Sequence, residues 1–296
     1  MIKRVVEISS GPTNLTLRHS QLILSRDGEE IGQVPIEDLG VLVVDDRSVT
    51  YTNALLCALL ANNVSVVVCG ENHVPAGLFL PMEGNTVQAE VFALQVEAMP
   101  RLKKRLWKEI VAEKIRNQAD VLMQGNREGA VLVEMAKRVA AGDPENMEAR
   151  AAVVYWQRLF GGDFCRDRYG YPPNNFLNYG YAVLRAAVAR AVVSSGLHPS
   201  LGIHHCNKYN AFALADDLME PVRPMVDSIV YQMWKEGKSE LTKEEKARLL
   251  GVLSSPVDWQ GQNFPLMVAL HHYMASLKRA LAGEEKGLYF PRLVFY

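Results

Sequence analysis

The stretch LTLRHSQLILSRDGEEIGQVPIEDLGVLVVDD, residues 15–46, decides the fold class of this 296-residue chain. Leu15 and Leu17, and then Leu22 and Leu24, alternate with polar neighbours, which is the period of half-buried β-strands. A turn signal, Asp27-Gly28, separates these segments from QVPI and from the apolar run GVLVVDD. Short strands joined by tight turns are therefore predicted for the beginning of the chain.

The residues around this stretch extend the same pattern. VVEIS (5–9) precedes it and VSVVVCG (64–70) follows it, and both are typical of strands. Between them TNALLCALLANN (52–63) predicts one helix, which Thr52 or Asn53 would cap. HVPAGLFLP closes the region, and MEGN (82–85) is a plausible boundary. We expect a β-rich N-terminal domain over residues 1–85.

The pattern turns helical from about residue 86 onward. Residues 87–123 carry apolar positions three and four apart, interrupted at Pro100. The other predicted helices lie near 127–141, 144–160, 174–195, 210–234, 242–253 and 262–282. The sequence therefore predicts an α+β protein with a small β-rich domain followed by a larger all-helical domain, 86–296.

Composition excludes several protein classes. Net charge is −1 and 49% of the residues are apolar, as in ordinary globular proteins, so a nucleic-acid binder would need a local basic patch. The four cysteines form no CxxC pair, which argues against a zinc finger or a disulfide framework. We find no signal peptide and no apolar run that could cross a membrane, and we expect a soluble cytoplasmic protein.

A basic segment, RLKKRLWK (101–108), is the first candidate for function. Arg101, Lys104, Arg105 and Lys108 fall at helical spacing on one face, and an apolar face lies beside it. Such a stripe can bind the phosphates of a nucleic-acid backbone. It is also what the solvated face of an ordinary amphipathic helix looks like, and the stripe alone does not decide between them.

Glu148 is the second candidate. Asp143 is predicted to cap a helix with Pro144 at its first position, which would put Glu148 beyond the capping residues. On a helical projection Glu148 lies with Ala151, Tyr155 and other apolar residues. A carboxylate there needs a metal ion or an arginine to compensate it, unless it lies exposed at the helix edge.

The third candidate is HHCNKYNAFALADDLME (204–220). Asp216, Asp217 and Glu220 project within a narrow arc of a predicted helix, and His204 and His205 sit in the loop before it. Acids three apart can share a divalent ion that a loop histidine joins, and such a mixed set suits Mn²⁺ or Mg²⁺. An ordinary amphipathic helix gives the same pattern.

Together these segments resemble a known family. The chain is similar over nearly its whole length to the CRISPR-associated spacer-acquisition integrases, the "Cas-one" family. The matching segments are residues 34–77, RLWKEIVAEKIRNQA (105–119), EARAAVVYW (148–156), residues 172–205 and LADDLMEPVRP (214–224). NNFLNYGYAVLRA (174–186) and SSPVDWQGQNFPL (254–266) resemble most the version that accompanies type II systems.

The resemblance implies partners and a reaction. Family members have a β-rich and a helical domain, form homodimers, and assemble with a small partner protein, "Cas-two", into a heterohexameric integration complex. That complex joins the 3′-hydroxyl ends of short foreign double-stranded DNA to the repeat edges of the CRISPR array by transesterification. The alternative is a metal-dependent endonuclease without joining activity; a non-catalytic scaffold and a small-molecule metallohydrolase are less consistent with these residues.

The resemblance also implies the site. Glu148, His205 and Glu220 match the family's metal-binding residues, and Asp217 matches the other carboxylate of its D-L-x-E motif. They would hold Mg²⁺ or Mn²⁺, while Asp216 and His204 would be bystanders. The basic stripe would contact DNA backbone, and Arg223 would contact a phosphate or pair with an acid. No covalent intermediate is needed, so we expect the cysteines to be buried structural residues.

Overall fold

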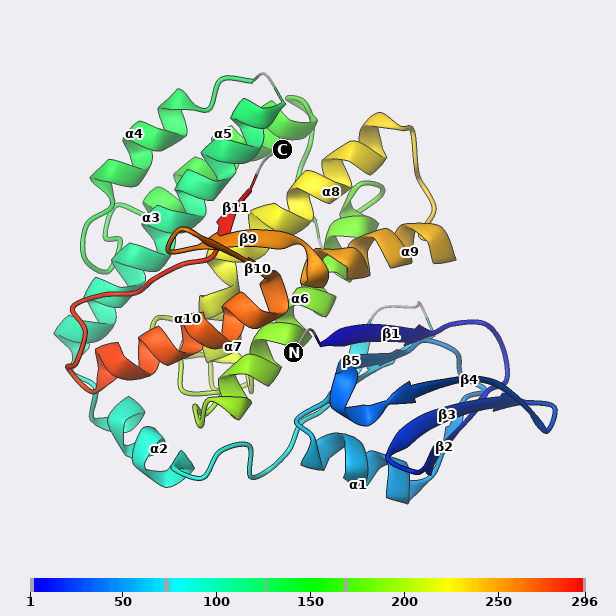
Figure 1. Cartoon of the computed structure of the whole chain (residues 1–296). Coiled ribbons are helices and arrows are strands. Elements are labelled where there is room, and N and C mark those ends of the chain that lie inside the picture. Colours follow the sequence, from blue (N-terminus) through cyan, green and yellow to red (C-terminus); the bar gives the residue numbers. More distant parts are fainter. Residues whose placement is uncertain (1–2, 72–74, 126, 168–169, 295–296) are drawn as a thin grey trace.

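The computed structural model describes residues 3–71, 75–125, 127–167 and 170–294. A β-rich part precedes a helical part, which confirms the α+β class (Figure 1). The N-terminal elements are β1 (Arg4–Ile8), β2 (Asn14–Arg18), β3 (Gln21–Arg26), β4 (Glu29–Pro35), η1 (Ile36–Asp38), β5 (Leu39–Val44), β6 (Thr50–Tyr51), α1 (Asn53–Ala61), β7 (Ser65–Cys69) and β8 (Pro75–Phe79).

The second part is mainly helical. The chain enters it after β8, and the domain boundary at residue 85 stays a prediction. Its elements are α2 (Gln88–Glu97), α3 (Pro100–Gln124), α4 (Ala130–Arg138), α5 (Met147–Phe160), α6 (Asn174–Ser194), α7 (Ala213–Met219), η2 (Glu220–Val222), α8 (Arg223–Lys235), α9 (Lys243–Leu250), η3 (Gly251–Ser254), β9 (Pro256–Trp259), β10 (Gln262–Pro265), α10 (Leu266–Leu281) and β11 (Arg292–Leu293). Among the described residues no helix has the length and apolar character needed to span a membrane.

Two sheets form the N-terminal part. One has the order β1-β5-β7-β8, with β1, β5 and β7 parallel and β8 antiparallel, and the other has the order β4-β3-β2-β6. The predicted turn joins β3 to β4, where Asp27 and Gly28 both have positive φ as a tight hairpin requires. Thr52 caps α1 as expected, because its side chain accepts a hydrogen bond from the amide of Leu55.

Strand β5 explains why the run GVLVV is apolar without alternation. All six of its residues are buried. Leu42 and Val44 face the N-terminal core with α1, whereas Val41 and Val43 pack into the core of the helical part. A strand covered on both faces has no polar side, which gives a continuous apolar run. The sheet is therefore shared between the two parts of the chain.

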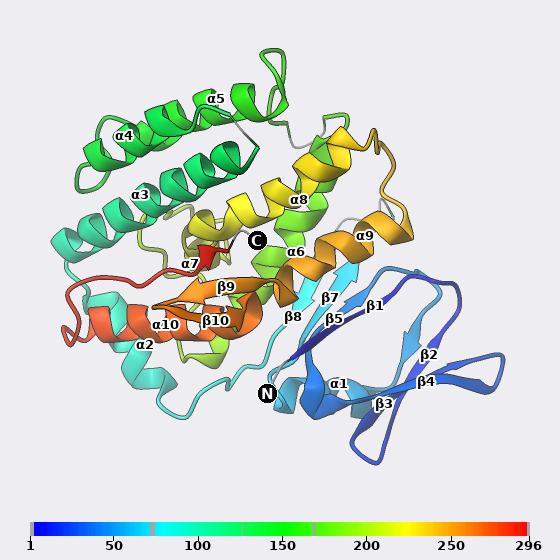
Figure 2. The same cartoon turned by 45° about the horizontal axis from the view of Figure 1, so that its top comes forward.

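Helix α6 covers the second face of this sheet. It contacts β5, β7 and β8 on one side and α7, α8, α9 and α10 around the rest of its surface (Figure 2). Most of its residues are buried, so it is apolar almost all round, as the central helix of a large core must be. Among the elements that carry candidate residues, α7 packs directly on this helix.

Apart from shifts at helix ends, the structure departs from the predicted helices at two places. A small sheet, β10-β9-β11, interrupts the part predicted as all-helical, because Gln260 and Gly261 both have positive φ and close a hairpin between β9 and β10. The helix predicted over 210–234 is divided into α7, η2 and α8, because Pro221 and Pro224 cannot continue the backbone hydrogen bonding of α7.

A buried ion pair joins the two parts. Lys246 on α9 contacts Asp45 at the end of β5, and their side chains are 7% and 1% exposed. We expect Lys246→Met to lower the free energy of unfolding by about 3–5 kcal/mol, because it removes the cation that compensates the buried carboxylate. Thermal or denaturant unfolding of the whole chain measures the loss.

The matched control is Lys243→Met. Lys243 lies one turn earlier on the same helix and donates to Ser10 across the same junction, but it is exposed. We expect that variant to cost less than about 1 kcal/mol. Equal stability of the two variants would contradict a stabilising role for the buried pair.

Candidate metal centre

Glu148 lies in the first turn of α5. The helix begins at Met147 rather than at Pro144, so the predicted start is wrong by three residues. Asn146 has a left-handed conformation, which breaks the helix before that point. Asp143 still caps the helix, because its carboxylate accepts from the amides of Met147 and Glu148 at 2.8 and 2.9 Å. This cap fixes the place from which the Glu148 side chain leaves the helix.

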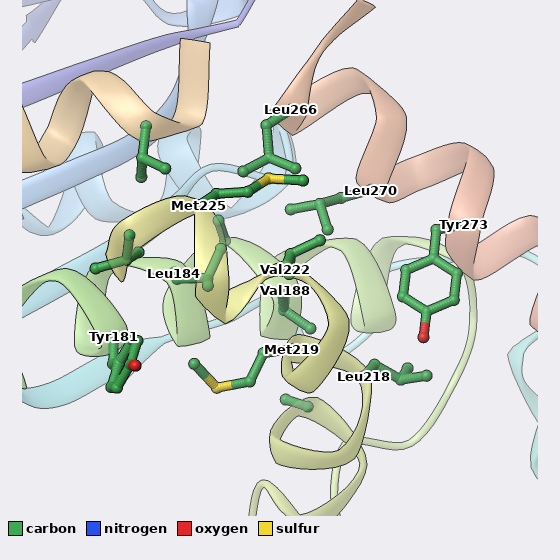
Figure 3. Packing of buried hydrophobic residues seen from close by; sticks show 14 of the residues in the cluster. Tyr181, Leu184, Val188, Leu218, Met219, Val222, Met225, Leu266, Leu270 and Tyr273 are labelled. Atoms are coloured by element: carbon green, nitrogen blue, oxygen red, sulfur yellow. The ribbon is translucent and has the colours of Figure 1, made fainter. Parts of the chain in front are cut away.

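Apolar neighbours hold the acids of the second segment in position. Leu218, Met219 and Val222 are buried against α6, α8 and α10, and Figure 3 shows their side chains in this layer. Since these residues anchor α7 and η2, the alternate positions Asp217 and Glu220 are turned toward α3 and the preceding loop. The side-chain amide of Asn117 on α3 also donates a hydrogen bond to the backbone carbonyl of Pro221, at 2.7 Å. The packing of these apolar neighbours therefore determines where the side chains of Asp217 and Glu220 point.

Lys114 of α3 lies between the two glutamates. Its Nζ is 2.6 Å from Glu148 Oε1 and 2.5 Å from Glu220 Oε2, and its side chain is 12% exposed. Burial acts to lower the pKa of Lys114, but the attraction of both carboxylates outweighs it and raises that pKa. Two carboxylates from α5 and η2 thus converge on one cation.

Arg223 holds Glu220 from the other side. Its Nε is 2.8 Å from Glu220 Oε1, although the N–H is not directed well enough for a hydrogen bond. Burial acts to raise the pKa of Glu220, but Arg223 and Lys114 outweigh it and lower that pKa, so Glu220 is an anion. Of the two roles considered for Arg223, pairing with an acid is the one that this geometry provides.

His205 points at Asp217. Its Nδ1 is 2.5 Å from Asp217 Oδ1, and this hydrogen bond raises the pKa of His205 against the effect of burial. Asp217 is fully buried and also accepts from the backbone amides of Ile203, His204 and His205. With these donors around it, Asp217 fixes the loop and orients the imidazole, leaving Nε2 as the free ring nitrogen.

An aromatic stack supports the same loop. The ring of His204 lies 4.2 Å from the indole of Trp107, with 3° between the planes, and His205 meets the edge of that indole at 5.6 Å. Trp107 itself is buried. His204 therefore contacts α3 rather than the two glutamates. Asp216 also points elsewhere and pairs with Arg185 at 2.6 Å.

The donor set fits a divalent cation. Glu148 and Glu220 already share one cation, and Glu220 Oε2 is buried without a well-directed hydrogen bond, so it has a lone pair available. Carboxylate oxygens with one imidazole nitrogen suit Mg²⁺ or Mn²⁺. In the described part of the chain no three His, Cys, Asp or Glu side chains converge as metal ligands do, since Lys114 stands between the glutamates.

The basic stripe lies beside this centre. Arg101, Lys104, Arg105 and Lys108 are exposed on α3, while Leu106 is buried beneath them. An open groove next to the stripe is lined by residues of α3 and of the loop that carries the histidines. Its lining includes Met99, Lys103, Lys104, Trp107, Ile203 and His204. A polyanion lying along the stripe would reach the loop of His205.

Three residues of the centre were missed by the sequence analysis: Lys114, Trp107 and Asn117. All three lie on the apolar side of α3, in register with Ile110. A lysine or an asparagine at such a position is unusual, and this is the signal by which the sequence could have indicated them. The prediction of buried cysteines is wrong, since Cys57, Cys165 and Cys206 are exposed.

Comparison with known proteins gives a matching family and several relatives. The family model described as "CRISPR associated protein Cas1" matches residues 6–253. The CRISPR-associated endonuclease Cas1 of Neisseria meningitidis serogroup C (strain 8013) is 36% identical over 285 residues, covering 95% of this chain and 93% of that protein. These matches fall on the segments that build the centre.

Solved structures share the fold. A casposase bound to integration product superposes with a TM-score of 0.77 at 19% identity, covering 96% of this chain and 92% of that one. A chain of a Cas6-RT-Cas1–Cas2 complex gives 0.75 at 18% identity, covering 96% of this chain and 35% of that one. At these identities the likeness concerns the fold alone.

A buried acid behind the centre makes stability depend on pH. Burial raises the pKa of Asp227 to about 7, although the hydroxyls of Tyr155 and Tyr181 donate to it and Tyr181 also stacks against Arg223. Between about pH 4 and 7 the folded protein therefore keeps a proton on Asp227 that the unfolded chain has already released. This group's contribution to stability is present at low pH and is lost as pH rises through 7.

Asp227→Asn removes that dependence. We expect the stability of the wild type relative to this variant to fall by about 4 kcal/mol between pH 4 and pH 8, because the amide has no proton to lose. Denaturant unfolding of both proteins across that range measures the difference. A constant difference would show that Asp227 titrates alike in the folded and unfolded states.

Proposed function

Because this chain belongs to the Cas1 family of CRISPR-associated proteins, we propose that it is a metal-dependent DNA integrase of CRISPR adaptation. Its substrates are short double-stranded DNA fragments and the repeat edges of the CRISPR array. The observation that carries this proposal is the convergence of Glu148 and Glu220 on a single cation next to His205. The relative named an endonuclease and the casposase bound to integration product support DNA-strand chemistry.

In this proposal Glu148, Glu220 and His205 hold the ion. A divalent ion bound there would neutralise the negative charge that builds up on the phosphoryl oxygens and on the attacking or leaving oxygen. The imidazole must be neutral to ligate through Nε2, and its hydrogen bond to Asp217 keeps the ring oriented for that task. Arg223 keeps Glu220 ionised, as a ligating carboxylate must be.

DNA would approach along α3. The stripe Arg101, Lys104, Arg105 and Lys108 presents four cations to solvent, and the groove beside it ends at the loop of His204. Cations of this kind bind the phosphate backbone without reading base sequence. Sequence selection in the array then comes from other contacts, including those of partner proteins.

We extend the proposal to the assembly. Two homodimers of this chain would flank a dimer of a Cas2 protein in a heterohexameric complex, for which a solved structure with the same fold, titled as a Cas6-RT-Cas1–Cas2 complex, gives support. The competing function is DNA cleavage without joining, which the same ligand set would serve and which the name of the curated relative favours.

Strand transfer distinguishes these functions. The protein with its Cas2 partner, a short duplex and a supercoiled plasmid carrying the repeat is incubated with Mn²⁺ or Mg²⁺, or with EDTA. We expect metal-dependent joining, and a loss of at least about 100-fold in Glu148→Gln and His205→Ala, because each variant removes a ligand.

The control variant is Glu145→Gln. Glu145 lies just before α5 with an exposed side chain that pairs with Arg150 at 3.7 Å, so the same chemical change should leave joining intact. Cleavage without joining would favour the endonuclease. Joining that persists in Glu148→Gln would exclude the proposed metal centre.

The stripe makes DNA binding depend on salt. We expect Lys104→Ala to reduce the slope of log K against log salt by about 0.9 for duplex DNA, and Lys104→Ala with Lys108→Ala by about twice that, as each lost phosphate contact releases fewer counterions. Lys235→Ala, an exposed lysine at the end of α8, removes the same charge elsewhere and should leave the slope unchanged. Equal slopes in all variants would mean that DNA does not lie along α3.

A further inference from the structure

Lys114 is buried where two carboxylates would otherwise repel each other. Its ammonium is within 2.6 Å of Glu148 and 2.5 Å of Glu220, and its side chain is 12% exposed. The two glutamates come from different elements, α5 and η2, and both of these elements pack on α3. Unlike charges at this distance attract strongly in a partly dehydrated site, and like charges repel as strongly.

Other cations do not replace Lys114 in this role. Arg223 pairs with Glu220 alone, through Oε1 on the side away from Lys114. In the described part of the chain Lys114 is the one basic side chain within ion-pair distance of Glu148. Removing the ammonium would leave Glu148 without a counter-charge and would leave Glu220 paired only by Arg223, through Oε1.

We propose that Lys114 is a positioning residue that occupies the cation position of the metal-free centre and that a divalent ion must displace it. This inference rests on the proposed metal centre. In the absence of metal the ammonium keeps the two carboxylates together and the centre folded. When a divalent ion binds, the ammonium gives up both contacts, so the affinity for metal is lower than the carboxylates alone would give.

The position of Lys114 has a consequence for DNA. Its stem starts from the middle of α3, the helix whose first turns carry the basic stripe. Lys114 lies on the apolar side of α3, away from the stripe, so the donors of a displaced ammonium are free for a phosphate oxygen of DNA that reaches the centre itself. Metal binding and phosphate binding would then favour each other, because each relieves a competing contact.

Three variants test the inference. Lys114→Met keeps the length of the side chain and removes its charge, Lys114→Arg keeps the charge, and Lys108→Met removes an exposed charge from the same helix. Two quantities are measured: the Tm in EDTA and in excess Mn²⁺, and the Mn²⁺ affinity from the electron paramagnetic resonance signal of free Mn²⁺. Wild type and Glu148→Gln provide the reference for binding at this centre.

We expect Lys114→Met to lower the Tm in EDTA by about 5 °C or more, because Glu148 then lacks a counter-charge and Glu220 keeps only that of Arg223. It should bind Mn²⁺ on the order of tenfold more tightly than the wild type, since no ammonium has to leave, and Mn²⁺ should raise its Tm by more than it raises that of the wild type. Lys114→Arg and Lys108→Met should behave as the wild type in both measurements.

A double variant keeps the test decisive if Lys114→Met alone does not fold. Lys114→Met with Glu148→Gln leaves one carboxylate, which Arg223 pairs, so its Tm in EDTA should recover most of the loss. No recovery, or Mn²⁺ affinity in Lys114→Met equal to or below that of the wild type, would overturn the inference. Wild-type protein whose Mn²⁺ binding does not depend on Glu148 would instead overturn the proposed metal centre.

Discussion

The ion pairs of Lys114 with Glu148 and Glu220 are the constraint on which the rest of the centre depends. They join α3, α5 and η2 at one point, where Lys114 and Glu220 are largely buried and Glu148 is partly exposed. Asn117 adds a contact that holds η2 against the same helix, and Arg223 pairs with Glu220 from the start of α8. The loop of His205 is then placed against α3 by the Trp107 stack and by the buried carboxylate of Asp217.

This arrangement needs a rigid support, which the shared core provides. Strand β5 buries both faces, and α6 lies between that sheet and α7, the helix that carries Asp217. Apolar residues next to each functional acid, such as Leu218 and Val222, fix the direction in which the acid points. The N-terminal sheet therefore contributes to the geometry of a centre to which it gives no side chain.

Much of the fold followed from local signals. The turn at Asp27-Gly28, the cap at Thr52 and the break between helices at Pro100 all act through the backbone of neighbouring residues, so a sequence displays them directly. The start of α5 and the hairpin β9–β10 were not predicted. Each depends on a residue in the left-handed conformation, Asn146 or Gln260, and neither residue type requires that conformation. Lys114 was missed for a different reason, since its partners are 34 and 106 residues away in the chain and only the tertiary structure brings them together.

The most direct test of the central claim is a crystal structure of the protein soaked with Mn²⁺, with the ion located by its anomalous scattering. We expect one strong peak within ligand distance of Glu148, Glu220 and the Nε2 atom of His205, with the ammonium of Lys114 moved out of the space between the two carboxylates. A peak elsewhere, or Lys114 still bridging the glutamates at saturating Mn²⁺, would contradict the account.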